Sequence, residues 1–160
     1  MPSGSGEPHG IKPIGLSAVE TLRIESGLLF PDIDYFPTQT DPFEVRLDKV
    51  IKLDSAADFV GRDALARIAA DGTPRLLTTL RIDGDEVPEY GAAVMVDGAD
   101  VGIVRSPCKS PTFDAVIAMA AIDRELAHEG TRVEVALGGA VGATVAPFPL
   151  YDTEKKRPRS

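Results

Sequence analysis

Between Arg75 and Pro147 the chain alternates short apolar runs with glycine-containing turns, a pattern that only a few folds can satisfy. Six runs fit short strands, at residues 76–82, 92–96, 100–105, 115–122, 132–137 and 142–146. Asp97-Gly98 joins two of them and suits a two-residue hairpin turn, which requires positive φ at both positions. Strands at this spacing predict a small barrel or sandwich, and we take a six-stranded antiparallel barrel as the expected fold; a flat sheet with one face on the preceding helices is the alternative. Residues 115–122 are apolar throughout, so that strand is expected to be buried on both faces.

The stretch from Gly15 to Gly27 predicts a short helix ahead of this strand-rich half. Ser17 and Glu20 have the spacing of a capping box, in which two side chains satisfy free N–H groups of the first turn. Gly27 stands where a helix ends through a left-handed residue. Spacings of three and four place four residues on one face, which we expect to point inward: Val19, Leu22, Arg23 and Ser26.

Arg23 is the unusual member of that face, since an unpaired buried charge is costly. One interpretation is that its guanidinium snorkels at the edge of an apolar stripe or pairs with a structural carboxylate. The other is that it enters a ligand pocket and holds an anion, because its planar fork matches a carboxylate through two parallel hydrogen bonds.

The connection that follows contains Pro31, Pro37 and Pro42, which forbid a continuous helix. We expect an irregular, aromatic-rich segment, a strand near residues 46–53, and a second helix over residues 62–70 that Gly72 ends. The predicted class is therefore α+β, mainly β. The expected division is a flexible arm (1–14), a helix and connector segment (15–72), the barrel (73–150) and a basic tail (151–160).

Composition excludes several classes of function. The net charge is −8, which argues against a general nucleic-acid or anionic-membrane binder. No 18-residue apolar run or signal peptide is present, so a cytoplasmic location is expected. The only histidines are His9 and His128, which argues against a histidine-based metal site. Cys108, the single cysteine, lies beside Lys109; it is either an incidental residue or a thiol with a lowered pKa.

Several short segments, taken in order, resemble the glycine-cleavage T-protein (aminomethyltransferase) family. They lie at residues 22–27 (LRIESG), 33–34, 42, 59–65 (FVGRDAL), 101–106 (VGIVRS), 110–113 (SPTF), 117–120 (IAMA), 130–135 and 147–148. No single segment is specific, but their order and spacing cover most of the chain, and they resemble the C-terminal portion of the family with its barrel domain.

The resemblance implies a folate-dependent transfer of a one-carbon unit from a small methyl or aminomethyl donor to tetrahydrofolate. Segment 15–72 would belong to the folate-binding region, and Arg23 would contact the folate. Tyr151 and Arg157, after the Pro147-Phe148 step, are the further candidates for folate contacts. Glu25 would shape the helix. The family's catalytic aspartate and its pterin-binding glutamate have no counterpart here, so no catalytic or metal-binding residue is assigned to this chain.

Two hypotheses follow. In the first, the chain completes a folate pocket together with an N-terminal portion or a separate subunit, and is inactive without it. In the second, it is a non-catalytic assembly module that uses the barrel as a protein-contact surface. Apolar side chains in the first 70 residues would be exposed without a covering partner, so dimerisation or disorder is expected before about residue 70, and a homo-oligomer is possible. The chain departs from the family at Arg105-Ser106, where the family usually has an uncharged Thr-Ser pair.

Overall fold

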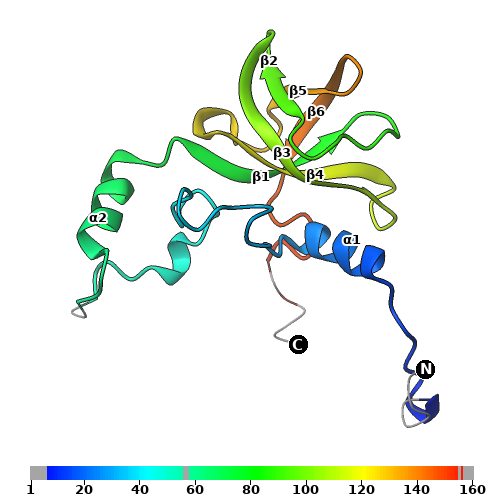
Figure 1. The fold of residues 1–160 in the computed structure, drawn as a ribbon, viewed down its shortest axis with the longest axis horizontal. Coiled ribbons are helices and arrows are strands. Elements are labelled where there is room, and N and C mark those ends of the chain that lie inside the picture. Colours follow the sequence, from blue (N-terminus) through cyan, green and yellow to red (C-terminus); the bar gives the residue numbers. More distant parts are fainter. Residues whose placement is uncertain (1–6, 56–57, 155, 157–160) are drawn as a thin grey trace.

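The computed structural model describes residues 7–55, 58–154 and 156. Two α-helices precede six strands (Figure 1). The elements are η1 (Glu7–His9), α1 (Leu16–Ser26), η2 (Asp48–Val50), α2 (Arg62–Asp71), β1 (Arg75–Ile82), β2 (Ala93–Val96), β3 (Ala99–Ser110), β4 (Ala115–Asp123), η3 (Arg124–Leu126), β5 (Arg132–Ala136) and β6 (Ala140–Ala146).

The six strands form a closed antiparallel barrel in the order β1-β4-β3-β2-β5-β6, which confirms the predicted fold class. Asp97 and Gly98 have φ values of 51° and 79°, as the two-residue hairpin turn between β2 and β3 requires. Closure pairs β1 with both β4 and β6, so no barrel edge is left unpaired. In Figure 1 the barrel lies above α1, and α2 extends to one side.

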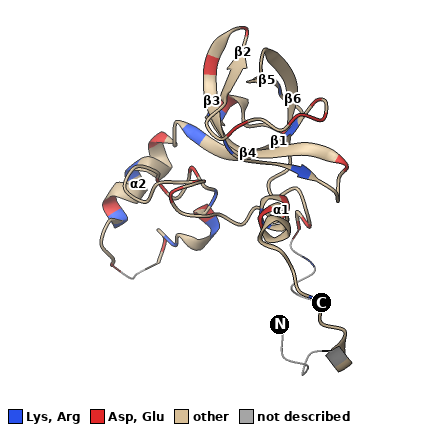
Figure 2. Cartoon of the chain, turned by 45° about the vertical axis from the view of Figure 1, so that its right-hand side comes forward, with Lys and Arg blue, Asp and Glu red and all other residues tan. Residues whose placement is uncertain are grey.

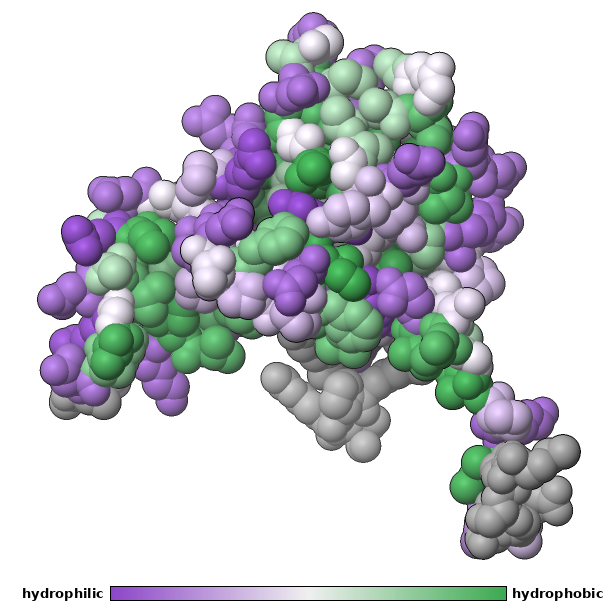
Figure 3. All heavy atoms as spheres, in the orientation of Figure 1, coloured by the Kyte–Doolittle hydropathy of each residue, from purple (hydrophilic) through white to green (hydrophobic). Residues whose placement is uncertain are grey.

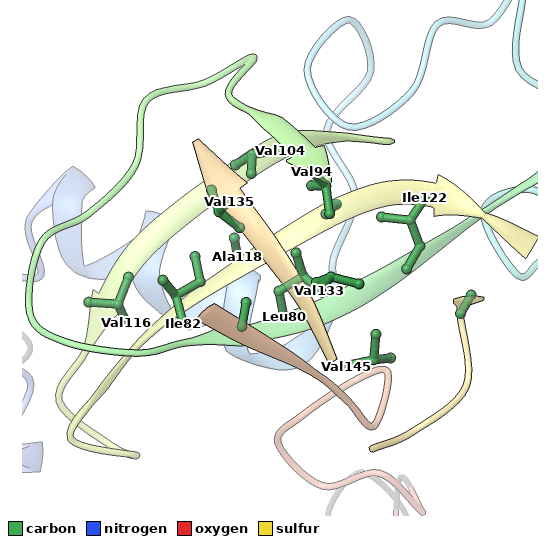
Figure 4. Close-up of a cluster of buried hydrophobic side chains, with 13 residues drawn as sticks. Leu80, Ile82, Val94, Val104, Val116, Ala118, Ile122, Val133, Val135 and Val145 are labelled. Carbon is green, nitrogen blue, oxygen red and sulfur yellow. The ribbon is translucent and has the colours of Figure 1, made fainter. Parts of the chain in front are cut away.

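Strand β4 is buried on both faces, as its unbroken apolar sequence predicts. One face points into the barrel, where Val116, Ala118 and Ile122 pack against side chains of the other strands (Figure 4). The opposite face carries Ile117 and Met119, which join a second apolar cluster with Ile24 of α1. The apolar contacts of the helix with the outside of the barrel are thus made partly through β4.

Helix α1 differs from the sequence expectation at its start and in its orientation. Gly15 is the N-cap residue and no side chain caps the helix, so the predicted Ser17–Glu20 capping box is wrong. Val19 and Leu22 are exposed, whereas Arg23, Ile24 and Glu25 are buried. The inward face is therefore rotated from the predicted one, because buried ion pairs and hydrogen bonds hold Arg23 and Glu25 against the barrel.

The end of α1 agrees with the expectation. Gly27 adopts φ 66° and ψ 30°, and Leu28 N–H donates to Arg23 O at 2.9 Å. A Cβ at Gly27 would come within 2.9 Å of the Pro149 side chain, so the segment after the barrel passes close to the end of the helix.

The connector contains no strand at residues 46–53, which contradicts the prediction there; η2 occupies residues 48–50 instead. Its backbone crosses the outside of β1, where Leu77 N–H donates to Glu44 O at 2.7 Å and Arg46 Nε donates to Leu77 O at 2.7 Å. Arg46 has a positive φ of 60°, and this turn breaks the extended conformation that the alternating sequence suggested.

Helix α2 begins after Gly61 and ends at Gly72, both with positive φ, which confirms the predicted second helix. None of its residues is buried. Figure 2 shows acidic and basic residues distributed along it, at a distance from the barrel.

Candidate functional site

The candidate site lies where α1 meets the outside of strand β3. Arg23 is 3% exposed and Asp34 is 3% exposed, and their side chains form an ion pair with Nη1 and Oδ2 2.6 Å apart. Ser106 of β3 completes a triangle, since it accepts from Arg23 Nη2 at 2.8 Å and donates to Asp34 Oδ1 at 2.5 Å. Three segments far apart in sequence are thereby joined by one buried polar cluster.

The guanidinium of Arg23 is fully hydrogen-bonded within the chain. Besides Asp34 and Ser106, Nη1 reaches Leu28 O at 3.4 Å, and Glu20 accepts from both Nε and Nη2. The Phe30 ring centroid lies 4.4 Å from the guanidinium carbon. Burial alone would lower the pKa of Arg23, but the hydrogen bond that it donates to Glu20 and the charge of Asp34 raise the pKa overall.

This geometry realises the interpretation in which Arg23 pairs with structural carboxylates. Glu20 is the accessible partner, with 45% of its side chain exposed, while the Asp34 side chain is 0% exposed. The solvent-accessible side of this cluster is therefore the one at Glu20. Whether Arg23 contacts a folate stays a prediction.

Glu25 does more than shape the helix. Its side chain is 2% exposed and accepts from Ser110 Oγ at 2.5 Å and from Thr112 Oγ1 at 2.9 Å. Both hydroxyls come from the end of β3 and the turn after it. The sequence contained the signal, since a second ionisable residue two positions after Arg23 in a short helix also needs buried partners.

A cavity of about 460 Å³ adjoins this cluster and is bordered by α1, the turn at residues 32–33, Tyr90 and β3. Arg105 lies in its wall. Val104 pairs with Ala120 and Ser106 with Met119, so Arg105 is the extra residue of a β-bulge. Its Nη1 donates to Tyr90 Oη at 3.1 Å, and its guanidinium carbon lies 5.2 Å from the centroid of the Phe36 ring.

The other two folate candidates fall at the C-terminal end. Tyr151 N–H donates to Glu25 O at 2.8 Å, which brings this residue next to the end of α1. Arg157 lies outside the described residues. The structure thus brings Tyr151 to the helix that carries Arg23 and leaves Arg157 unplaced.

The surface around the site is apolar on the side away from the barrel. Among the described residues, the exposed large apolar side chains are concentrated before residue 72, and only Val87 and Tyr90 belong to the barrel. On α1, Leu16 is 88% exposed, Val19 40% and Leu22 50%. Figure 3 shows apolar surface along the lower side of the molecule, over α1 and the segments near α2.

Two other expectations concern Cys108 and metals. Burial, followed by the charges of Glu25 and Glu20, raises the pKa of Cys108 to about 11, which opposes a reactive thiolate. Within residues 7–55, 58–154 and 156, no cluster of three or more His, Cys, Asp or Glu side chains is arranged to hold a metal ion. In the same part of the chain, every helix is too short or too polar to cross a bilayer.

Comparison with known proteins places residues 75–152 in the family described as the glycine cleavage T-protein C-terminal barrel domain. The chain is 41% identical to a trimethylamine-oxide aldolase of Ruegeria pomeroyi, over 98% of this chain and 20% of that protein. It is 40% identical to an aminomethyltransferase of Saccharopolyspora erythraea, over 92% of this chain and 40% of that protein.

Among solved structures, the glycine cleavage system aminomethyltransferase T from Bartonella henselae superimposes with a TM-score of 0.80 and 25% identity. The match covers 94% of this chain and 42% of that one. The chain therefore spans between one fifth and about two fifths of the length of these relatives.

Proposed function

The chain belongs to the glycine-cleavage T-protein family, as its C-terminal portion, and we propose that it forms one wall of a tetrahydrofolate site in a one-carbon transferase. The rest of the pocket, with the residues that handle protons, would come from an N-terminal portion or a separate subunit. The transferred group would be a methyl or aminomethyl unit from a small donor. In this proposal the protein supplies position rather than covalent chemistry, because holding donor and folate together gives much of the rate.

The observation that carries the proposal is the two-sided character of α1. Its inner side is fixed to the barrel by the buried contacts of Arg23 and Glu25. Its outer side presents Leu16, Val19 and Leu22 to solvent. A helix with apolar residues on both sides normally lies between two layers, and contiguous exposed apolar surface marks a contact site.

This distribution favours segment 15–72 as the contact surface over the barrel, which exposes few large apolar side chains among the described residues. It therefore supports pocket completion over the assembly module based on the barrel. The same surface would also suit a second copy of this chain, so a homo-oligomer remains an alternative assembly. A reducing compartment such as the cytoplasm fits a chain with one cysteine.

Within the proposed site, Arg23 would hold the folate from the side now occupied by Glu20, and Tyr151 would contribute from the end of α1. Arg157 stays a candidate for the same ligand. The donors of Arg23 are already used, so a ligand oxygen would have to displace the exposed Glu20 carboxylate.

Titration of tetrahydrofolate into the 160-residue chain tests the proposal. We expect weak binding that Arg23→Lys reduces, because an ammonium group cannot reproduce the planar fork. Arg67→Lys, on the exposed side of α2, is the matched control. Equal affinity of the unmodified chain and Arg23→Lys, with both variants folded by circular dichroism, would contradict a role for Arg23 in holding folate.

A further inference from the structure

Arg105 is a cation without a carboxylate partner in the wall of the cavity beside α1. None of the described residues forms an ion pair with it, although Glu20 and Asp32 border the same cavity. Both carboxylate oxygens of Glu20 accept hydrogen bonds from Arg23, so Glu20 is already engaged. Glu44 lies close enough for the charge of Arg105 to affect its pKa, but forms no ion pair with it.

The hydrogen bonds of Arg105 are incomplete. Nη1 donates to the Tyr90 hydroxyl, while Nε is buried and has no partner. Buried donors without acceptors are uncommon in folded proteins and call for an explanation. The Arg105 guanidinium contacts the Phe36 ring and the Tyr90 hydroxyl, and no carboxylate in the described part of the chain forms an ion pair with it.

The backbone conformation at Arg105 is a second, independent sign of a functional site. Arg105 is the extra residue of the bulge in β3, between Val104, which points into the barrel core, and Ser106, which belongs to the Arg23 cluster. Bulges redirect a side chain and are common next to functional sites. The cavity volume of about 460 Å³ falls within the range of small-molecule sites, roughly 300–1,000 Å³.

We propose that Arg105, together with the Tyr90 hydroxyl, binds a carboxylate of a small ligand in this cavity. A guanidinium that lines such a cavity can bind a carboxylate through charge-assisted hydrogen bonds. The nearby carboxylate of Asp32 disfavours a doubly charged group such as phosphate at the same position. The carboxylate could belong to the glutamyl end of a folate or to a free amino acid. The first source rests on the proposed function, whereas the carboxylate site itself does not.

Calorimetric titration of the full 160-residue chain tests this site with two probes. N-(4-aminobenzoyl)-L-glutamate carries the glutamyl carboxylates without a pterin, and glycine represents a free amino acid. Each is compared with its amide, in which the carboxylate charge is removed. We expect one of the two acids to bind and its amide to bind about tenfold more weakly, as the loss of a charged hydrogen-bond pair implies.

Variants assign the effect to the named residues. Arg105→Gln should weaken binding of the acid about tenfold and leave the amide unchanged. Tyr90→Phe, a change at an exposed residue, should weaken binding of the acid less than Arg105→Gln does. Arg81→Gln, on the exposed side of β1, is the matched control and should have no effect. Equal binding of acid and amide, no loss in Arg105→Gln or Tyr90→Phe, or no binding of either probe would overturn the proposal.

The outcomes separate this inference from the proposed function. Tetrahydropteroate, which lacks the glutamyl group, reports on the folate site alone. Its failure to bind, together with Arg105-dependent binding of an acid probe, would reject the folate site and retain the carboxylate site. Binding of tetrahydropteroate and tetrahydrofolate with equal affinity, unaffected by Arg105→Gln, would reject the folate tail as the source.

Discussion

Arg23 of α1 and Asp34 of the following turn form a buried ion pair, with Nη1 and Oδ2 2.6 Å apart. Asp34 also accepts hydrogen bonds from Phe30 N–H at 2.7 Å and Ser106 Oγ at 2.5 Å. The carboxylate thus fixes the turn after the helix and connects both to the barrel. Through Ser106, the pair is linked to β3.

Removing the charge of Asp34 should destabilise the fold strongly. In Asp34→Asn the buried guanidinium of Arg23 loses its least exposed acidic partner, and breaking a buried pair on one side typically costs about 3–5 kcal/mol. Urea denaturation monitored by circular dichroism measures the change. Asp32→Asn, two residues away and exposed, is the control. Its free energy of unfolding should stay within about 0.5 kcal/mol of that of the unmodified chain. Similar unfolding midpoints for the two variants would show that the pair contributes little.

The Glu25–Ser110 contact should show energetic coupling. Ser110→Ala leaves the buried carboxylate with one hydroxyl donor fewer, at an expected cost of about 1–3 kcal/mol in the free energy of unfolding. In a double-mutant cycle with Glu25→Gln, the two costs should not add. Ser17→Ala serves as the control, because Ser17 is exposed and does not cap α1. Strict additivity would mean that the two side chains do not interact in solution.

Gly102 should resist substitution because of packing rather than backbone conformation. A Cβ there would lie 2.4 Å from Ala121 O and 2.7 Å from Ile122 Cα, both backbone atoms of the paired strand β4. Gly102→Ala is therefore expected to lower stability by about 1–3 kcal/mol through overpacking. Gly139→Ala is the matched control, since a Cβ at Gly139 meets nothing within 4 Å. Equal melting temperatures for the two variants would contradict the close approach of β3 and β4.

Cys108 should react slowly with iodoacetamide. Its pKa is raised to about 11 by burial and by nearby Glu25 and Glu20, whereas an unfolded cysteine ionises near 8.5. The alkylation rate of the folded chain should therefore rise with an inflection near 11, and that of the urea-unfolded chain near 8.5. The thiol's contribution to stability is complete below pH 8.5 and is lost as the pH rises towards 11. An inflection below 9 in the folded chain would contradict the burial of this thiol.

Regular patterns in the sequence predicted the barrel well. Alternation, Gly turns and the unbroken apolar run of β4 specify strands locally, and antiparallel strands joined by short turns have few ways to close. The ends of both helices were also predictable, since Gly27 and Gly72 mark positions that favour positive φ.

The site was harder to predict, because contacts between distant segments determine it. Val19 and Leu22 follow helical periodicity, yet the buried ion pair with Asp34 turns Arg23 inward and leaves both apolar residues exposed. The bulge at Arg105 has no local sequence signal, because it results from the register between β3 and β4. The strand expected at residues 46–53 was wrong because Arg46 adopts a left-handed conformation to bond Leu77 O.

The affinity for tetrahydrofolate, measured with the separate pieces and with their mixture, tests pocket completion most directly. The complementing piece is the region of the Saccharopolyspora erythraea aminomethyltransferase that precedes its match to this chain. We predict at least tenfold tighter binding in the mixture than for either piece, and loss of that gain in Leu22→Asp, because the charge would interrupt the exposed apolar side of α1. An affinity in the mixture equal to that of the better single piece would contradict the claim that this chain completes the folate pocket.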